Sequence, residues 1–303
     1  MALKYIKATA LSFIASVALF NQASAQQIFK ISQFTQHNFL YNPAAAGAAE
    51  NSSVGVAYRS QWSGIDGGPK TVFAYGDHFI SGKSIGIAPV IYSDKTGPTS
   101  RTGGQVNVSY AMKLNDRSRL HLGLGADILQ YKIDMNKIGE YIPNDPLLAS
   151  SGTTTKADAS FGVYYTSPKL SGGIGIQNLI QSKLGFVKTD AKVTDGKLYR
   201  HYFAMANYKI QMDEVNTLTP TMLIKYMPNA PTEYEVGARF EHDNLISFGA
   251  NWCYRQMVNF QVGVKVAKKF QIGYCYEVYN SPINVFSTGG NAHEVLLRYN
   301  FIK

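Results

Sequence analysis

The sequence predicts an all-β fold, a transmembrane antiparallel β-barrel of about 14 strands. Three observations support this prediction. Charged residues are only 16% of the chain, while aromatic residues are 13%. From Ser53 onward, apolar residues alternate with polar residues or glycine, in segments long enough to cross a bilayer as tilted strands. The connections between these segments alternate between short and long, as in barrels with short periplasmic turns and long outer loops.

The first 25 residues have the pattern of a secretory signal peptide. Lys4 and Lys7 precede an apolar run, 8–20, that is too short to be a spanning helix. Small residues end at Ala25, so we expect cleavage before Gln26 and export of the mature chain. A buried N-terminal helix is the less favoured interpretation. After cleavage, we expect an N-terminal periplasmic segment over 26–52 and the barrel over 53–303.

Each predicted strand has an apolar face and a polar or glycine face. In 119–130, for example, leucines alternate with His121, Gly123, Gly125 and Asp127. We expect the glycines to leave room where strands curve, and Tyr and Trp near strand ends to form girdles at the two interfaces. The predicted girdle residues are Tyr58, Trp62, Tyr92, Trp252, Tyr254 and Tyr276. The predicted strands are 53–63, 71–80, 83–93, 104–113, 119–130, 158–167, 170–180, 200–209, 217–227, 232–241, 244–254, 258–266, 270–278 and 293–301.

The long connections are 93–104, 131–157, 181–199 and 279–292, and they all fall at the same end of the predicted barrel. This arrangement puts both termini in the periplasm of an integral outer-membrane protein. A soluble all-β sandwich is the alternative, but a sandwich has no reason to sort its loops in this way.

Charges of both signs fall on the face that we expect to line the lumen. A mixed network of pairs that fills the interior is favoured over a selectivity ring, which would have one sign. Cys253 and Cys275 are also inward, on strands separated by one other, roughly 10 Å apart by strand spacing, which is too far for a disulfide. The main charged positions are Asp127, Glu233, Glu235, Arg239, Lys265, Glu294 and Arg298.

The stretch YRSQWSGIDGGPKT, Tyr58 to Thr71, combines an arginine, a tryptophan and a glycine-rich turn. Its spacing does not match a phosphate-binding P-loop, and a strand follows it. We expect a tight outer loop, with Arg59 and Gln61 pointing into the lumen and Trp62 at the outer interface. A contact with a partner protein is the functional alternative. Its candidate residues are Arg59, Gln61, Trp62, Gly67, Pro69 and Lys70.

The segment FTQHNFLYNPAAAG precedes the first strand, so it lies either in the periplasm or in the lumen. It either caps the lower mouth of the barrel or docks to a periplasmic partner, and the sequence does not favour one over the other. The candidate contact residues are Gln33, Phe34, Gln36, Asn42 and Pro43.

Several motifs, in order along the chain, resemble the PorP/SprF family of Bacteroidota. They are SQFTQHNFLYNPAAAG (32–47), the YRSQWSGIDGGPKT stretch, SDKTGP (93–98), GGIGIQNLI (172–180) and HEVLLRYNF (293–301). The chain departs from the family pattern at Ala45, where a larger residue is common, and in the two residues that follow Phe301.

The resemblance implies an outer-membrane barrel of the type IX secretion system. The implied partners are periplasmic ring or peptidoglycan-linked proteins of that system, the C-terminal domain of a secreted cargo or gliding adhesin, and outer-membrane lipid. The alternative is a channel for passive or specific uptake of small solutes.

Other function classes have little support. The net charge of +9 is scattered, without the basic stripe of a nucleic-acid-binding protein. None of the six His lies in a recognised catalytic motif, so we expect no enzyme activity. We expect no cofactor and no metal site.

Overall fold

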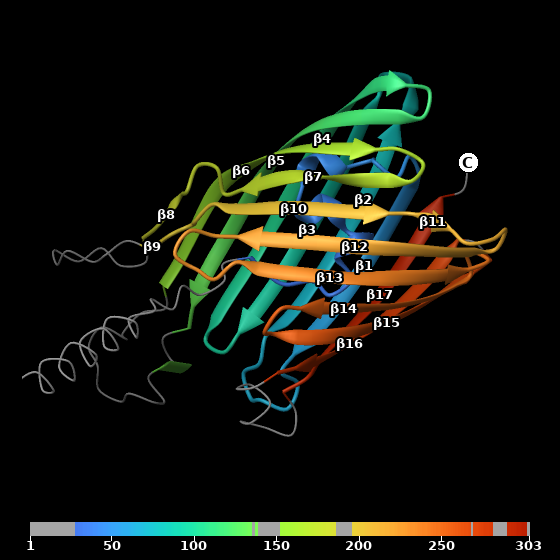
Figure 1. Cartoon of the computed structure of the whole chain (residues 1–303). Coiled ribbons are helices and arrows are strands. Elements are labelled where there is room, and N and C mark those ends of the chain that lie inside the picture. The colour runs from blue at the N-terminus through green and yellow to red at the C-terminus, as the bar shows by residue number, and fades with distance from the viewer. Residues whose placement is uncertain are drawn as a thin grey trace, which may run out of the picture.

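The computed structural model describes residues 28–134, 137–138, 152–185, 196–267, 269–280 and 290–301. Fourteen long strands form a closed antiparallel barrel, which confirms the predicted fold (Figure 1). Each strand pairs with its neighbour along the chain, and β17 pairs with β1 to close the sheet. The long strands are β1 (Ser52–Gln61), β2 (Lys70–Ile80), β3 (Ile85–Thr96), β4 (Thr99–Asn115), β5 (Ser118–Ile133), β6 (Gly152–Thr166), β7 (Leu170–Gln177), β10 (His201–Tyr208), β12 (Asn216–Tyr226), β13 (Glu233–His242), β14 (Ile246–Cys253), β15 (Met257–Val266), β16 (Phe270–Tyr279) and β17 (Ala292–Phe301). The short strands are β8 (Lys183–Leu184), β9 (Gly196–Lys197) and β11 (Ile210–Gln211).

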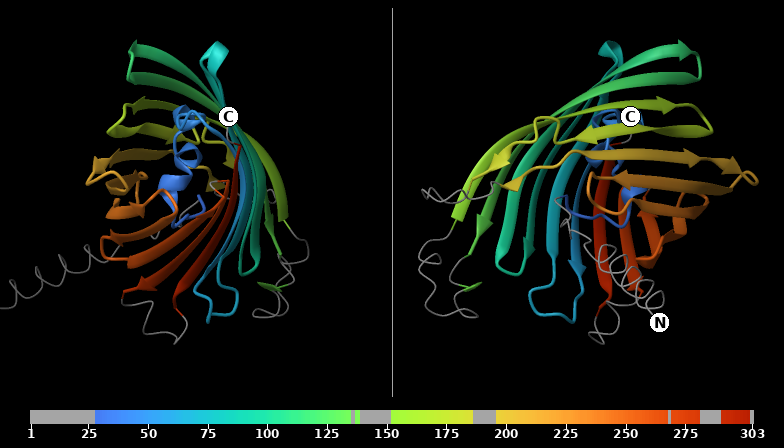
Figure 2. Two further views of the ribbon diagram at one scale, coloured as in Figure 1. Left: turned by 90° about the vertical axis from the view of Figure 1, so that its right-hand side faces the viewer. Right: turned by 60° about the vertical axis from the view of Figure 1, so that its left-hand side comes forward.

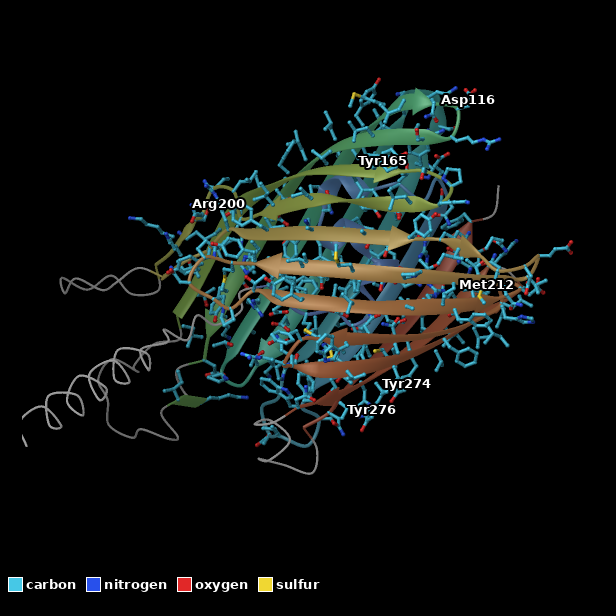
Figure 3. All side chains as sticks on the ribbon, in the orientation of Figure 1. Asp116, Tyr165, Arg200, Met212, Tyr274 and Tyr276 are labelled. Atoms are coloured by element: carbon cyan, nitrogen blue, oxygen red, sulfur yellow. The ribbon has the colours of Figure 1, made fainter. Side chains whose placement is uncertain are left out.

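The barrel is apolar outside and largely polar inside. Outward side chains such as Leu124 and Ile174 are 66% and 60% exposed. Inward positions include fully buried polar residues such as Asn107 and Asn259. Side chains stand out from the strands along the whole outer surface, among them Tyr274 and Tyr276 of β16 (Figure 3). An outer surface of this kind suits hydrocarbon and not water.

The short connections gather at one end of the barrel, as predicted. This short-turn end comprises the connections 81–84, 116–117, 167–169, 209–215, 243–245 and 267–269.

At the other end, which we call the long-loop end, the prediction of one loop is wrong. The predicted loop 93–104 is mostly strand, because β3 and β4 run on to a turn at 97–98. Asp94 accepts hydrogen bonds from Thr71 (2.6 Å) and Arg101 Nε (3.2 Å), which ties three strands together there. Gly97, at φ +53°, permits the tight turn.

Two of the predicted girdle aromatics point inward instead. Tyr58 and Trp252 are outward and half exposed, as expected. Tyr92 lies on the lumen side, with its ring 4.9 Å from the ring of Phe29. Trp62 packs against Tyr279, an inward residue of β16 (centroid distance 6.3 Å). Trp62 therefore packs on inward side chains of the wall itself, whereas Tyr92 turns inward because the lumen contains polypeptide on which it can pack.

That polypeptide is the N-terminal segment, residues 28–51, which we call the plug. It lies inside the barrel (Figure 2), so the lumen placement is the one observed. Its secondary structure is three short 3-10 helices, η1 (Phe34–Gln36), η2 (Asn38–Leu40) and η3 (Pro43–Ala45). Asn42 caps η3 by accepting a hydrogen bond from Ala44 N (3.0 Å), and Pro43 follows at the first helical position.

The plug enters at one end of the lumen and leaves at the other. Ile28 lines a cavity with Leu129, Asp158 and Leu198, towards the long-loop end. The plug then leads into β1 at the short-turn end, where β17 also finishes. The expectation that both termini lie at the short-turn end therefore fits the end of β17 but not the first described residue. The predicted signal peptide and its cleavage site lie outside the described residues.

Candidate functional site: the plugged lumen

The wall of the lumen has a groove of glycines that fits the plug backbone. We define the glycine groove as Gly86, Gly123, Gly162 and Gly175, which lie on β3, β5, β6 and β7, respectively. A Cβ at these positions would lie only 2.0, 2.2, 1.9 and 2.3 Å, respectively, from atoms of plug residues 41–46. Only glycine therefore allows the plug to approach this closely. Strand curvature, the expected reason for these glycines, does not account for such contacts.

Wall side chains also satisfy the polar backbone of the plug. Asn107 donates to Phe39 O (3.0 Å) and Ser109 Oγ donates to Ala46 O (2.7 Å). In the other direction, Gly47 N donates to the carboxylate of Asp77 (2.6 Å) and Asn42 Nδ2 donates to Val163 O (3.0 Å). Buried backbone groups need such partners, so the wall specifies the irregular path of the plug.

A buried ion cluster, which we call the arginine clamp, fastens the start of the plug. It consists of Arg59, Glu277 and Glu294. Arg59 makes two hydrogen bonds to Glu277, of 2.6 and 2.9 Å, and its Nη1 lies 3.7 Å from Glu294. Glu294 accepts from the backbone N–H groups of Ser32 (2.7 Å) and Gln33 (3.1 Å). One arginine thus holds two carboxylates, and one of these carboxylates holds the plug.

A second group of charges lies on β12 and β13. Glu235 accepts from the side-chain amides of Asn251 (3.1 Å) and Asn259 (3.3 Å). Lys225 lies 3.6 Å from Glu233 and 5.4 Å from the centre of the Tyr41 ring in the plug. The lumen contains a network of both signs and not a ring of one sign.

His37 in the plug is buried in a cage of aromatic rings. The rings of Tyr75, Phe73 and Phe39 lie 4.8, 5.1 and 6.1 Å from its own. Neither ring nitrogen has a hydrogen-bond partner. Burial, and secondarily the charge of Arg298, lowers the pKa of His37 well below its usual value, so His37 is neutral in the docked plug.

Among the described residues, no helix is long and apolar enough to cross a membrane. No group of three or more His, Cys, Asp or Glu side chains in those segments is arranged to hold a metal ion.

A family model described as type IX secretion system membrane protein PorP/SprF matches residues 23–299. The chain belongs to the PorP/SprF family. No curated protein matches the sequence.

Among solved structures, this PorP/SprF protein is similar to outer-membrane barrels at low sequence identity. One is the Acinetobacter baumannii outer membrane protein Omp33, with 7% identity, a TM-score of 0.49, and coverage of 83% of this chain and 98% of the other. Another is the CymD monoaromatic hydrocarbon channel, with 10% identity, a TM-score of 0.49, and coverage of 92% and 94%. A third is the KdgM porin, with 11% identity, a TM-score of 0.40, and coverage of 82% and 99%.

The structure divides the candidate contact residues of this PorP/SprF protein into two groups. Those buried inside the lumen contact other parts of the same chain, so in this conformation they present no surface to a partner. Gln36 is half-buried at the short-turn mouth. The buried group is Gln33, Phe34, Asn42, Pro43 and Arg59. The rim group, around the β1–β2 connection, is Gln61, Trp62, Gly67, Pro69 and Lys70.

The structure also places the predicted lumen charges. All lie on the inner side of the wall: Glu294 belongs to the arginine clamp, Glu233 and Glu235 belong to the second group, and Asp127 borders the cavity beside Ile28. The remaining three, Arg239, Lys265 and Arg298, line the short-turn mouth.

Sequence reasoning missed the glycine groove and Tyr279, whose hydroxyl donates to Glu277 (2.8 Å). The alternation of glycine with leucine in β5 was a signal for the groove, but it does not say what approaches those glycines.

Proposed function

We propose that this PorP/SprF protein is a non-enzymatic, integral outer-membrane component of the type IX secretion system. In this proposal it supports secretion or surface anchoring of cargo, such as gliding adhesins, through protein contacts and not by conducting solutes. The short-turn end faces the periplasm, where secretion components dock, and the long-loop end faces outward. A Bacteroidota source and an N-terminal signal peptide are part of this proposal.

The plugged lumen is the observation that carries the proposal. The plug contributes Phe34, Phe39 and Tyr41 to the same buried cluster as Phe73, Phe203 and Leu296 of the wall. Towards the long-loop end, the cavity beside Phe29 and Tyr92 has a volume of about 50 Å³, enough for about one or two water molecules and not for a solute. A barrel filled in this way has its two ends and outer wall free to contact other molecules.

The second candidate is an outer-membrane channel for small solutes. The observation that favours it is the set of polar, solvent-accessible cavities at both mouths, of about 350 Å³ around the β1–β2 connection and about 540 Å³ at the short-turn end. To conduct, the barrel would first have to release the plug.

Deletion of the gene separates the two functions. The secretion role predicts loss of cargo from the medium or cell surface, with unchanged uptake of small solutes. The channel role predicts the reverse, namely slower uptake with normal secretion, and that result would overturn the proposal. Re-expression of the full chain is the control, and it should restore the lost activity in either case.

A further inference from the structure

The short-turn mouth contains a cavity whose lining includes three cations. The cavity, of about 540 Å³, lies between the plug and the ends of the strands from β13 to β17, which are neighbours in Figure 1. Three of its lining residues are cations on alternate strands, Arg239 on β13, Lys265 on β15 and Arg298 on β17. We call these three residues the basic mouth.

The carboxylates around the cavity do not neutralise the basic mouth. Glu241 is shared, because its Oε1 lies 3.4 Å from Arg239 and 3.5 Å from Lys265. Glu50 is paired with Arg119, on the far side of the plug. One carboxylate therefore serves two of the three cations.

Arg298 has no carboxylate within ion-pair distance among the described residues. Its only acceptor there is the side-chain oxygen of Gln36, at 3.5 Å from Nη1, which is the limit of a hydrogen bond. Its Nε is buried without a partner. Asp77, in an adjoining cavity that Arg298 also lines, instead accepts from the backbone of Gly47. Charged groups in a partly buried site usually have partners, so Arg298 is open to a ligand that can supply one.

The position of the basic mouth excludes some ligands. The three cations point into the lumen and not toward hydrocarbon, so lipid head groups on the outer wall do not reach them. The plug blocks the way through, so the site is a blind pocket open at the short-turn end.

The spacing of the cations favours a chain of carboxylates over a single small anion. Lys265 pairs in register with Gln271, which pairs with Arg298, so these two cations lie on one line across three strands. Two strand spacings separate their backbones by roughly 10 Å, which matches carboxylates three residues apart on a peptide in the polyproline II conformation, where they share one face about 9 Å apart.

We propose that the basic mouth binds an acidic segment of a periplasmic protein, with one carboxylate on Arg298 and another on Lys265. The inference rests on the proposed function only for the direction in which this end faces. It goes beyond that function by specifying that the periplasmic partner binds through an acidic segment.

Binding of a fluorescein-labelled hexaglutamate peptide to the purified full-length barrel in a neutral detergent tests the inference. We expect a rise in fluorescence anisotropy at low salt that weakens as salt is added. The double substitution Lys265→Gln with Arg298→Gln should weaken binding by roughly tenfold or more, since it removes two charge-assisted hydrogen bonds to the peptide.

Matched variants separate this site from general attraction to a basic protein. Lys132→Gln with Lys156→Gln removes the same charge from the neighbouring strands β5 and β6 at the opposite end, away from both mouth cavities, and should leave binding unchanged. Arg298→Lys keeps the charge and should retain most of the binding. Heat-modifiable migration in gel electrophoresis checks that every variant has a folded barrel.

Three results would overturn the inference. The first is no binding by the wild-type barrel at low salt. The second is equal loss in both double variants. The third is displacement of the peptide by inorganic phosphate at matched charge concentration, which would indicate a small-anion site.

Secretion in cells completes the test. With normal barrel levels, the Lys265→Gln and Arg298→Gln strain should export less cargo, and normal export would refute a partner role for the site. That outcome leaves the proposed function intact, because its own failure is measured in the deletion strain.

Discussion

Substitution of Gly123 by alanine should release the plug from the wall while leaving the barrel folded. The new Cβ would lie 2.2 Å from Ala44 N and 2.4 Å from Ala44 Cα, whereas ordinary contacts begin near 3.4 Å. The difference, 3.4 minus 2.2 Å, means that the plug must withdraw by more than 1 Å. Both close atoms belong to the backbone, so no rotation of a side chain can relieve the clash.

The free-energy cost of that withdrawal has two sources. Overpacking of a tight site costs about 1–3 kcal/mol. Moving η3 also strains the hydrogen bonds of Ser109 with Ala46 and of Asn42 with Val163, each worth about 1 kcal/mol net and more if its buried groups are left unpaired. We expect docking to weaken by about 3–5 kcal/mol, which is a factor of at least about 100 in the docking equilibrium.

Chymotrypsin digestion followed by mass spectrometry measures the release, because Phe34, Phe39 and Tyr41 are buried when the plug is docked. These sites should be cut much faster in Gly123→Ala, with heat-modifiable migration preserved. The matched control is Gly104→Ala on the neighbouring strand β4, where a Cβ would meet nothing closer than 3.6 Å. Equal protection of the plug in the two variants would refute the role of the glycine groove.

Three further predictions concern the clamp, the caged histidine and the outer wall. Arg59→Gln leaves Glu277 and Glu294 uncompensated, so the urea midpoint of unfolding should fall by the equivalent of about 3–5 kcal/mol; an unchanged midpoint would contradict the clamp. The pKa of His37 is lowered in the docked plug, so only the released plug gains a proton as the pH falls below about 6.5. Docking should then weaken by up to about 1.4 kcal/mol per pH unit and not at higher pH, and His37→Leu should abolish this dependence in the same digestion assay. Leu124→Lys places a charge on the outer face of β5 and should destabilise the barrel in lipid by about 2–4 kcal/mol if that position is near the bilayer midplane; a neutral effect would mean that hydrocarbon does not cover this face.

The sequence predicted the barrel because one face of each strand meets hydrocarbon and the other meets a polar lumen. These two environments require apolar residues to alternate with polar residues or glycine along the strand. Leu120, Leu122 and Leu124 face outward while His121 and Gly123 face the lumen, and this alternation identifies both the strand and its orientation. The pattern failed at 93–104, where polar and glycine residues resemble a loop. Contacts across strands, such as those of Asp94 with Thr71 and Arg101, extend the sheet there, and such contacts are not visible in a local pattern.

The plug was only partly predictable, because its path depends on residues that are distant in sequence. The inward charges identified the wall side of the arginine clamp, but not that Glu294 would hold the backbone of Ser32 and Gln33. Trp62 and Tyr92 were assigned to the interface because aromatic residues at strand ends commonly face lipid. The inward orientation of Tyr92 depends on a filled lumen, which the sequence left as one of two alternatives, and that of Trp62 depends on Tyr279 of a strand distant in sequence.

Single-channel recording in planar bilayers tests the central claim, that the N-terminal segment fills and closes the lumen. We predict that the purified full-length barrel shows no steady conductance, and that deletion of residues 28–48 produces discrete, long-lived openings. A large, steady conductance from the intact protein would contradict the account, as would a barrel that stays closed after the deletion while remaining folded.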